Sequence, residues 1–325
     1  MRSVVGLVRA GLLGLMLAWV GAAFAWLSMA SLAAAEPGWP AEISGGARLP
    51  DGTMVLVDDE TPSAIFLWDG DLTHPPVPRS LGGVFDDLEG VAADSSGAIY
   101  LLTSHSLTRR GRVRPERRRL ARWVPGAAAS QPGVGAGTLE VIDDLTPVLL
   151  RLLDTGPSQL SLEGLAWYPP GDQLFLGARA PLREGKALVV GLRSASRRFV
   201  KARTSQPSRD LDGDEPTVRA LDLGGRGIRD LAYDPWRGAI WVLAGPVGER
   251  GSSYALFLWK PESERIEAVA APGFESLAQP EGVMVLGPPD PVAGESLLII
   301  AGEGARPLRI GARLEPGPST RREIR

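Results

Sequence analysis

The chain has 325 residues, 44% of them hydrophobic and 22% charged, which is typical of a globular protein and not of a disordered one. A formal net charge of −3 gives no reason for a polyanionic partner, so we expect no nucleic-acid binding. Cysteine is absent and only 2 histidines occur, which excludes disulfides, thiolate zinc sites and a three-histidine metal site.

The first 35 residues differ from the rest of the chain. Arg2 and Arg9 precede a stretch without charge that runs from Ala10 to Ala35 and ends in small residues. A basic start, an apolar middle and an Ala-x-Ala-like end are typical of a secretory signal peptide. The uncharged stretch is also long enough to cross a bilayer, so an uncleaved N-terminal membrane anchor is the alternative. The sequence therefore predicts an exported protein, periplasmic or secreted, with residues 36–325 as its folded part.

From residue 40 onward the sequence predicts pairs of short β-strands separated by turns. Each run is rich in β-branched, aromatic and other apolar residues, and the 40 glycines and 28 prolines of the chain supply many turns. The paired runs are residues 54–59 and 64–68, 99–103 and 120–124, 174–178 and 187–192, 240–244 and 255–259, and 297–301 and 308–310. Trp68, Trp123 and Trp259 close the second run of three pairs, so the repetition extends to single residues.

A short motif, in most copies an acidic residue followed by glycine, precedes each pair of runs. Its copies are residues 42–47, 87–92, 161–166, 228–232 and 280–284, and candidate outer strands are residues 139–142, 218–222 and 266–269. Four strands per repeat of roughly 40–50 residues, with insertions, is the pattern of β-propeller blades. We predict an all-β fold in which residues 36–325 form a single β-propeller domain with four-stranded antiparallel blades.

Five blades can be counted from the motifs, and the insertion at residues 126–160 leaves room for a sixth. Residues 147–153 are the one helix-like stretch of that insertion and are predicted to lie in a connection. An ordinary β-sandwich is the alternative fold, but it would not explain why the motif precedes each pair of runs by nearly the same distance.

The motifs resemble those of a bacterial family known as domain of unknown function 3616. The matching stretches are residues 87–90, 101–106, 162–166, 224–231 and 244–246, in the family's order. The resemblance extends over most of the chain from Ile43 to Gly304 and implies a propeller-like fold. It implies no activity, because the family has no established one.

More distantly, the acidic–glycine step before a strand is similar to that of gluconolactonase- and strictosidine-synthase-like propellers. Those proteins bind a divalent cation with acidic and amide side chains around the central channel, which the similarity makes an expectation for this chain. The asparagine ligand typical of the lactonases has no counterpart here, since the chain contains no Asn.

Four acidic residues of the motifs are the candidate metal ligands. If the motifs are equivalent, Glu89, Glu163, Asp230 and Glu281 converge on one mouth of the channel. Like charges so close raise one another's pKa unless a cation compensates them, and Ca²⁺ or another divalent cation with several oxygen ligands would suit such a ring. The alternative is structural, with each carboxylate accepting backbone N–H bonds at its own turn.

Polar residues at the ends of the apolar runs form a second set. They are Asp58, Asp59, Ser104, His105, Arg179 and Glu303. The first run of each pair is predicted to be the innermost strand, so strand direction places these residues at the opposite mouth from the motifs. His105 is either a general base or a hydrogen-bonded structural residue. Arg179 is expected to face Asp58 or Asp59, which would clamp an anionic substrate or hold two blades together. These four residues, Asp58, Asp59, His105 and Arg179, are the candidate catalytic groups.

Nucleophile and zinc-helix signatures are missing, since the chain has neither a Gly-x-Ser-x-Gly nor a His-Glu-x-x-His sequence. Eight arginines lie between Arg109 and Arg122, which predicts either a solvated hairpin or a contact with an anionic membrane surface.

These features predict an exported monomer with an acidic site on the propeller axis. We expect it to be a ligand-binding or scaffold module for an unknown small molecule or protein. The alternative is a hydrolase of an ester, lactone or phosphate ester, assisted by a divalent metal. The fold alone favours neither, because propellers support both kinds of function.

Overall fold

The computed structural model describes residues 38–126, 137–204, 215–248, 253–274, 277, 279–292, 296–302 and 305–314. The predicted signal peptide or anchor at residues 1–35 lies outside these ranges, as does Glu303. Among the described residues, no helix combines the length and apolar character needed to cross a membrane.

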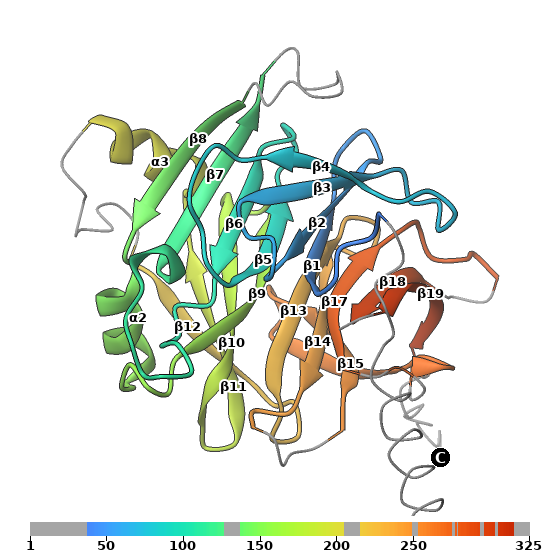
Figure 1. Ribbon diagram of the computed structural model, residues 1–325. Helices are drawn as coiled ribbons and strands as arrows, with labels where there is room; N and C mark the ends of the chain where they lie inside the picture. The colour runs from blue at the N-terminus through green and yellow to red at the C-terminus, as the bar shows by residue number, and fades with distance from the viewer. Residues whose placement is uncertain are drawn as a thin grey trace, which may run out of the picture. The chain divides into compact units, whose positions relative to one another are not determined.

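Antiparallel sheets, here called blades, follow one another along the chain (Figure 1). Blade 1 contains β1 (Ile43–Arg48), β2 (Met54–Asp58), β3 (Ala64–Trp68) and β4 (Val77–Ser80). Blade 2 contains β5 (Leu88–Ala93), β6 (Ile99–Thr103), β7 (Arg119–Pro125) and β8 (Gly137–Asp143). Blade 3 contains β9 (Ser161–Tyr168), β10 (Gln173–Arg183), β11 (Lys186–Leu192) and β12 (Thr217–Leu221).

Blades 4 and 5 complete the described part of the fold. Blade 4 contains β13 (Gly227–Asp234), β14 (Ala239–Gly245), β15 (Ala255–Lys260) and β16 (Arg265–Ala270). Blade 5 contains β17 (Pro280–Val285), β18 (Ser296–Gly302) and β19 (Ala305–Leu314). A short pairing of β16 with β19 joins these two blades at their outer edges.

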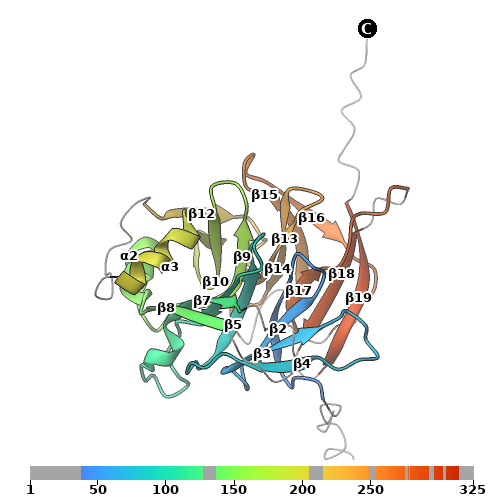
Figure 2. The same cartoon turned by 90° about the horizontal axis from the view of Figure 1, so that it is seen from above.

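The first strands of the blades form a closed ring around a central axis. Strands β1, β5, β9, β13 and β17 each contact the next one in this order, and β17 contacts β1 (Figure 2). This arrangement confirms the predicted all-β propeller, and the described residues supply five blades to it. Closing the ring lets every blade cover both of its apolar faces with its neighbours.

The glycine of the motif is explained by this ring. A Cβ atom at Gly90 would lie 2.8 Å from the Cβ of Leu165 and 3.0 Å from the carbonyl oxygen of Glu163 in the next blade. At Gly45 it would lie 2.7 Å from the carbonyl oxygen of Glu89. Neighbouring inner strands therefore approach so closely at the motif that only glycine fits without a shift.

The order of strands within a blade differs from the prediction in one respect. The apolar runs were expected to begin with the innermost strand, but they are the second and third strands, and the motif itself lies in the innermost one. The second strands are buried on both faces, as in β2, β6 and β14, because each lies between two neighbouring blades. A strand buried on both faces reads as a continuous apolar run, which makes it conspicuous in the sequence.

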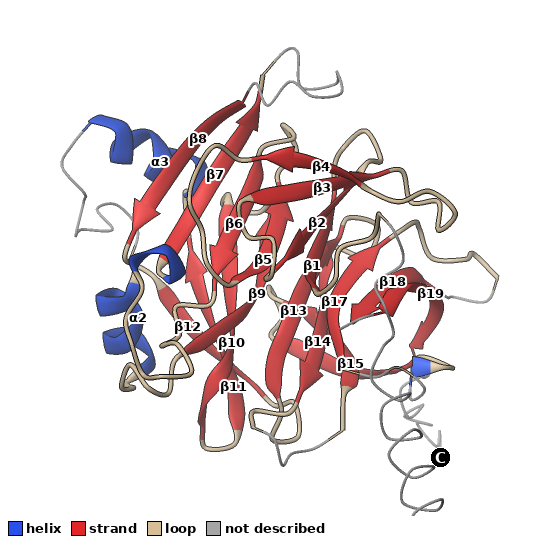
Figure 3. Ribbon diagram, viewed as in Figure 1, coloured by secondary structure: helices blue, strands red, loops and turns tan. Residues whose placement is uncertain are grey.

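Side chains between the blades form the core. Trp68, Trp123 and Trp259, which end β3, β7 and β15 or lie near their ends, are all at most 3% exposed. Helices α2 (Thr146–Leu153) and α3 (Ala195–Thr204) lie beside blades 2 and 3 (Figure 3), and Leu149 and Phe199 pack into the core between those blades. Helix α2 confirms the predicted helical stretch in the connection between β8 and β9.

Candidate functional site

Each inner strand carries one polar side chain at an irregularity of its pairing. The register between first and second strands shifts between Ile43 and Gly45, Leu88 and Gly90, Ile228 and Asp230, and Pro280 and Gly282, and a matching shift occurs in blade 3. The residues omitted from the pairing are Ser44, Glu89, Glu163, Arg229 and Glu281. Such β-bulges redirect a side chain, and here they recur at the same point in every blade.

This register corrects the predicted equivalence of the acidic residues. Arg229, and not Asp230, occupies the position of the three glutamates, while Asp230 stands where the other motifs have glycine. The predicted ring of four carboxylates at one level is therefore wrong. The ring contains three glutamates, one serine and one arginine.

Arg229 compensates two of the glutamates. Its Nε lies 3.0 Å from Oε2 of Glu163, and its Nη2 donates to Oε1 of Glu281. The Arg229 side chain is only 6% exposed, so this pair of contacts is largely shielded from water. The buried Glu163 and the half-buried Glu281, with an arginine between them, need no metal ion for charge compensation at that point.

Arg179 makes a further contact with Glu163. Its Nη1 donates to Oε1 of Glu163 at 3.0 Å, and its Nε donates to the carbonyl of Pro246 at 3.2 Å. The predicted pairing of Arg179 with Asp58 or Asp59 is therefore wrong. Its side chain remains 31% exposed, so Arg179 presents a cationic group to solvent at the edge of the ring.

Asp230 has a structural role. The residue is fully buried, and its carboxylate accepts N–H bonds from Leu231 at 2.7 Å and from Val283 of blade 5 at 2.8 Å. Burial raises the pKa of Asp230 well above its ordinary value, and the N–H donors oppose that rise. Asp230 therefore acts as an acceptor of backbone N–H bonds, which is the structural alternative to metal binding.

Apart from Glu303, which lies outside the described residues, the two predicted sets of polar residues lie at one mouth and not at opposite mouths. Asp58, at the end of β2, pairs with Ile43 at the start of β1, and Thr103, at the end of β6, pairs with Leu88 at the start of β5. Antiparallel neighbours run in opposite directions, so the end of a second strand lies beside the start of the first. The opposite-mouth prediction failed because it took the second strand as the one lining the axis.

Asp58 and His105 make contacts typical of structural residues. The two carboxylate oxygens of Asp58 accept N–H bonds from Glu42 at 2.8 Å and from Thr61 at 2.7 Å. His105 is 1% exposed, and its Nδ1 lies 2.8 Å from the carbonyl oxygen of Thr103. Burial lowers the pKa of His105 to about 4, so its ring is neutral near pH 7. These contacts favour the structural interpretation of both residues over the catalytic one.

A second arginine–carboxylate group lies on the rim at blade 2. Arg117 contacts Asp87 at 2.9 Å and Asp86 at 3.1 Å, and Asp87 also accepts a 3.3 Å bond from Ser106. Ser106 lies 2.8 Å from the hydroxyl of Ser104, whose side chain is buried. The end of β6 and the start of β5 are thus tied together by polar contacts.

Five of the eight arginines between Arg109 and Arg122 form ion pairs with carboxylates. They are Arg114, Arg117, Arg118, Arg119 and Arg122, whose partners include Asp86, Asp144, Asp143 and Glu140. Arg109, Arg110 and Arg112 are exposed. Most arginines of this segment therefore contact carboxylates of the same chain. Contact of the segment with a membrane surface stays a prediction.

The acidic cluster of Glu42, Asp59 and Glu60 lies at the same mouth. Each offers one carboxylate oxygen, and the three oxygens lie within 4.8 Å of one another. The Oδ1 atom of Asp59 is shielded from solvent and accepts no hydrogen bond from the described residues. Burial, followed by the charges of Glu42, Asp58, Asp87 and Glu281, raises the pKa of Asp59 to about 7.

Glu89 adds to the negative charge at this mouth. Burial, followed by the charges of Glu163, Asp87, Glu281 and Asp59, raises its pKa well above the ordinary value. No ion pair of Glu89 occurs among the residues that the structure describes. Arg229 acts on Glu89 only through its charge, without an ion-pair contact.

Sequence reasoning missed Glu42, Glu60 and Arg229. Glu42 opens the first motif copy, and Glu60 follows the predicted Asp59 directly, so both could have been flagged from their positions. Arg229 could have been found by aligning residues 229–232 with residues 89–92 and 163–166, which places Arg229 at the position of the glutamates.

The raised pKa of Asp59 predicts that mild acid stabilises the cation-free protein. The carboxyl ionises near pH 3.8 in the unfolded chain and near pH 7 in the folded one. Its contribution to stability is therefore complete below pH 3.8 and is lost as the pH rises to about 7. We expect the melting temperature, measured calorimetrically in EDTA, to rise as the pH is lowered from 8 to 6.5. The substitution Asp59→Asn should reduce that rise. Asp51→Asn, at an exposed carboxylate, is the control, and equal pH profiles of the two variants would contradict the prediction.

Comparison with known proteins supports the family resemblance and adds no activity. A family model described as "Protein of unknown function (DUF3616)" matches residues 153–278, which include blade 3 and blade 4. No curated protein matches the chain.

Several solved structures are similar to this chain at low identity. A structural genomics protein of unknown function from Bacteroides thetaiotaomicron is 13% identical with a TM-score of 0.47, covering 86% of this chain and 60% of that one, which is less than two thirds of its length. Pseudomonas fluorescens PhoX in complex with vanadate is 11% identical with a TM-score of 0.43, covering 83% of this chain and 68% of that one. A putative gluconolactonase is 11% identical with a TM-score of 0.39, covering 85% and 90%.

Likenesses at this level carry no information about ligands or reactions. The match of the family model, in contrast, falls on the stretch that contains the motifs at residues 162–166 and 224–231. Over residues 153–278, therefore, the chain matches the model of the family, DUF3616, that its motifs resemble.

Proposed function

We propose that the protein is a ligand-binding propeller whose acidic channel mouth holds a divalent cation of the Ca²⁺ class. The observation that carries the proposal is the cluster of Glu42, Asp59 and Glu60, in which a shielded oxygen of Asp59 accepts no hydrogen bond from the described residues. Carboxylate oxygens bind Ca²⁺ at 2.3–2.6 Å. Oxygens within 4.8 Å of one another are therefore close enough to share one ion.

The charge of the surrounding mouth supports the same proposal. The charges of Asp87 and Glu281 raise the pKa of both Asp59 and Glu89, so these negative charges act on the same small volume. A divalent cation would relieve this repulsion without requiring the carboxylates to take up protons. It would also keep coordination positions for oxygen atoms of a ligand, since Ca²⁺ takes six to eight.

Arg179 indicates the chemical class of that ligand. Its partly exposed guanidinium lies on the same mouth, in contact with Glu163. A cation and an arginine that face the same space attract an oxyanion, so we propose a small molecule with a carboxylate or phosphate group.

Calorimetric titration of the EDTA-treated protein with CaCl₂ tests the cation. We expect one Ca²⁺ per chain, an increase in melting temperature with Ca²⁺, and about tenfold or more weaker binding in Asp59→Asn. Asp51→Asn is the matched control, because it removes an exposed acidic group of the same blade, and it should bind like the wild type. Absence of both heat and thermal shift in the wild type would overturn the proposal.

The exposure of Arg179 also favours a second candidate, a hydrolase of an ester, lactone or phosphate ester. The cation would polarise the substrate oxygen, and Arg179 would stabilise the negative charge that develops on it. A panel of p-nitrophenyl acetate, dihydrocoumarin and p-nitrophenyl phosphate with CaCl₂ tests this candidate. Turnover that Arg179→Gln abolishes while Ca²⁺ binding persists would support it. A silent panel with intact Ca²⁺ binding would instead favour the binding module.

A further inference from the structure

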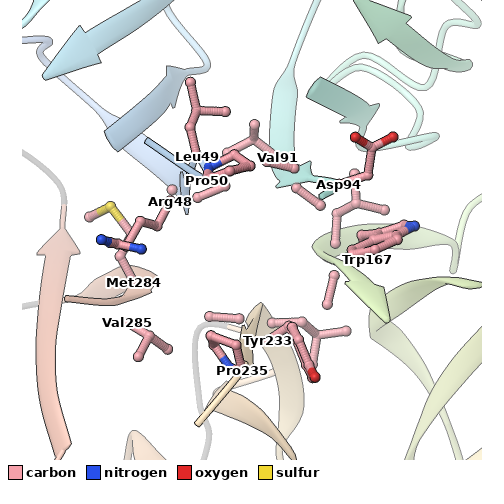
Figure 4. Close-up of a pocket in the computed structure, with 18 of the residues that line it drawn as sticks. Arg48, Leu49, Pro50, Val91, Asp94, Trp167, Tyr233, Pro235, Met284 and Val285 are labelled. Carbon is pink, nitrogen blue, oxygen red and sulfur yellow. The ribbon is translucent and has the colours of Figure 1, made fainter. Parts of the chain in front are cut away.

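A cavity of about 300 Å³ opens at the other end of the propeller axis. Its walls come from the C-terminal ends of the inner strands and the residues that follow them in all five blades (Figure 4). The acidic mouth lies at the opposite ends of the same strands, and the fully buried Asp230 lies between the two levels in β13. The cavity is therefore distinct from the acidic site.

The walls of the cavity are mainly apolar and aromatic. Trp167, Tyr233, Val91 and Val285 border the opening, and Trp236 stands on the rim with 42% of its surface exposed. A cavity of this size with aromatic walls is typical of small-molecule sites.

The carboxylate of Asp94 does not serve the cavity. It points away from the opening in Figure 4, and its oxygens accept hydrogen bonds from Ser96, Ala98 and Tyr100. These contacts stabilise the turn between β5 and β6. No carboxylate of the lining residues is therefore directed at a ligand.

Arg48 supplies the charge of this cavity. It lines the cavity from the end of β1, and its guanidinium carbon lies 5.6 Å from the centre of the Trp236 ring, which comes from blade 4. No ion pair of Arg48 occurs within the described part of the chain, where many other arginines have carboxylate partners. An arginine held on an aromatic ring without a carboxylate retains its capacity to bind an anion.

From this geometry we propose a second ligand site, in which the cavity binds a small aromatic monoanion. The flat apolar body of the ligand lies between Trp167, Tyr233 and Trp236, and its carboxylate or sulfonate accepts hydrogen bonds from Arg48. The site does not depend on the proposed cation, because it uses none of the residues of the acidic mouth.

Two fluorescent dyes of similar shape test the site. The probes are the anion 8-anilinonaphthalene-1-sulfonate and the neutral N-phenyl-1-naphthylamine, titrated into the folded protein at pH 7.5. We expect the anion to bind with a stoichiometry of one. Arg48→Gln should weaken binding of the anion about tenfold and leave the neutral dye nearly unchanged. Trp236→Ala should weaken both dyes about fivefold, because it removes an aromatic wall.

Matched variants and a folding measurement make the result decisive. Arg110→Gln, an exposed arginine of blade 2, should leave both dyes unaffected. Cooperative urea unfolding should be retained in every variant, since Arg48 and Trp236 are exposed. Equal binding of the anion by Arg48→Gln and the wild type, or by Trp236→Ala and the wild type, would overturn the proposal. Loss of Ca²⁺ binding in Asp59→Asn should leave both dye affinities unchanged.

Discussion

Replacing Arg229 by alanine is expected to lower the free energy of unfolding by about 3–5 kcal/mol. The substitution leaves Glu163 and Glu281 facing each other without the cation that now contacts both of them. The Glu163 side chain is 7% exposed, so water cannot replace the lost arginine efficiently. Arg229→Met, which keeps much of the volume, should be nearly as destabilising, which would assign the effect to charge and not to packing.

Urea denaturation at pH 8 measures the effect, and its pH dependence provides a further check. Arg229 opposes the burial that raises the pKa of Glu281. Without Arg229 that pKa rises further, so the loss of stability should shrink as the pH falls and the carboxyl takes up a proton. Arg265→Ala is the control, because its pair with Glu267 is 63% and 26% exposed, and it should cost less than about 1 kcal/mol. Equal losses of unfolding free energy in the two variants would show that the buried contacts of Arg229 stabilise the fold no more than an exposed ion pair does.

Replacing Asp230 by alanine is expected to cost about 2–4 kcal/mol, the second large effect. The N–H groups of Leu231 and Val283 would lose their acceptor in a region where the Asp230 side chain is fully buried. Asp230→Asn keeps one carbonyl acceptor and should lose about half as much. Because one of these bonds links blade 4 to blade 5, the loss weakens the contact between two blades.

Hydrogen exchange at the Val283 amide identifies the cause of that loss. Its exchange should accelerate in Asp230→Ala more than that of amides in β6, which lies in another blade. Asp69→Ala, at an exposed carboxylate, is the control and should leave both the exchange rates and the urea midpoint within experimental error. Unchanged protection at Val283 would show that the carboxylate does not hold this amide, and the structural role of Asp230 would have to be abandoned.

The architecture could be predicted because its causes are local. Strands such as β2 and β14 are buried on both faces, so they read as uninterrupted apolar runs between turn residues. The glycine of the motif recurs because neighbouring inner strands approach too closely for a side chain, as at Gly90. The burial of a second strand and the close approach at a glycine each arise within one blade or at one contact between blades. Each copy of the repeat therefore shows the apolar run and the glycine in its own sequence.

Part of the candidate site could also be predicted from the repeat. Glu89, Glu163 and Glu281 occupy corresponding bulges, and Asp59 and Arg179 lie at the same mouth. Residues that precede the apolar run of each blade by the same number of positions lie at the same level of the ring. Position in the repeat therefore predicted that these glutamates lie close together. The partners of these residues could not be predicted in this way.

Only the tertiary structure determined which charges compensate one another. Glu163 and Glu281 come from different blades, and both contact Arg229, which occupies the bulge position of blade 4. Position in the repeat places a side chain at the bulge, but it does not select the partner that this side chain contacts in another blade. The cavity at the other end of the axis also depends on contacts between blades. Arg48 and Trp236 lie in blades 1 and 4 and face each other only when the ring closes. The sequence by itself determined the blades and the shared level of Glu89, Glu163 and Glu281, whereas ring closure determined their partners, because those contacts join residues from different blades.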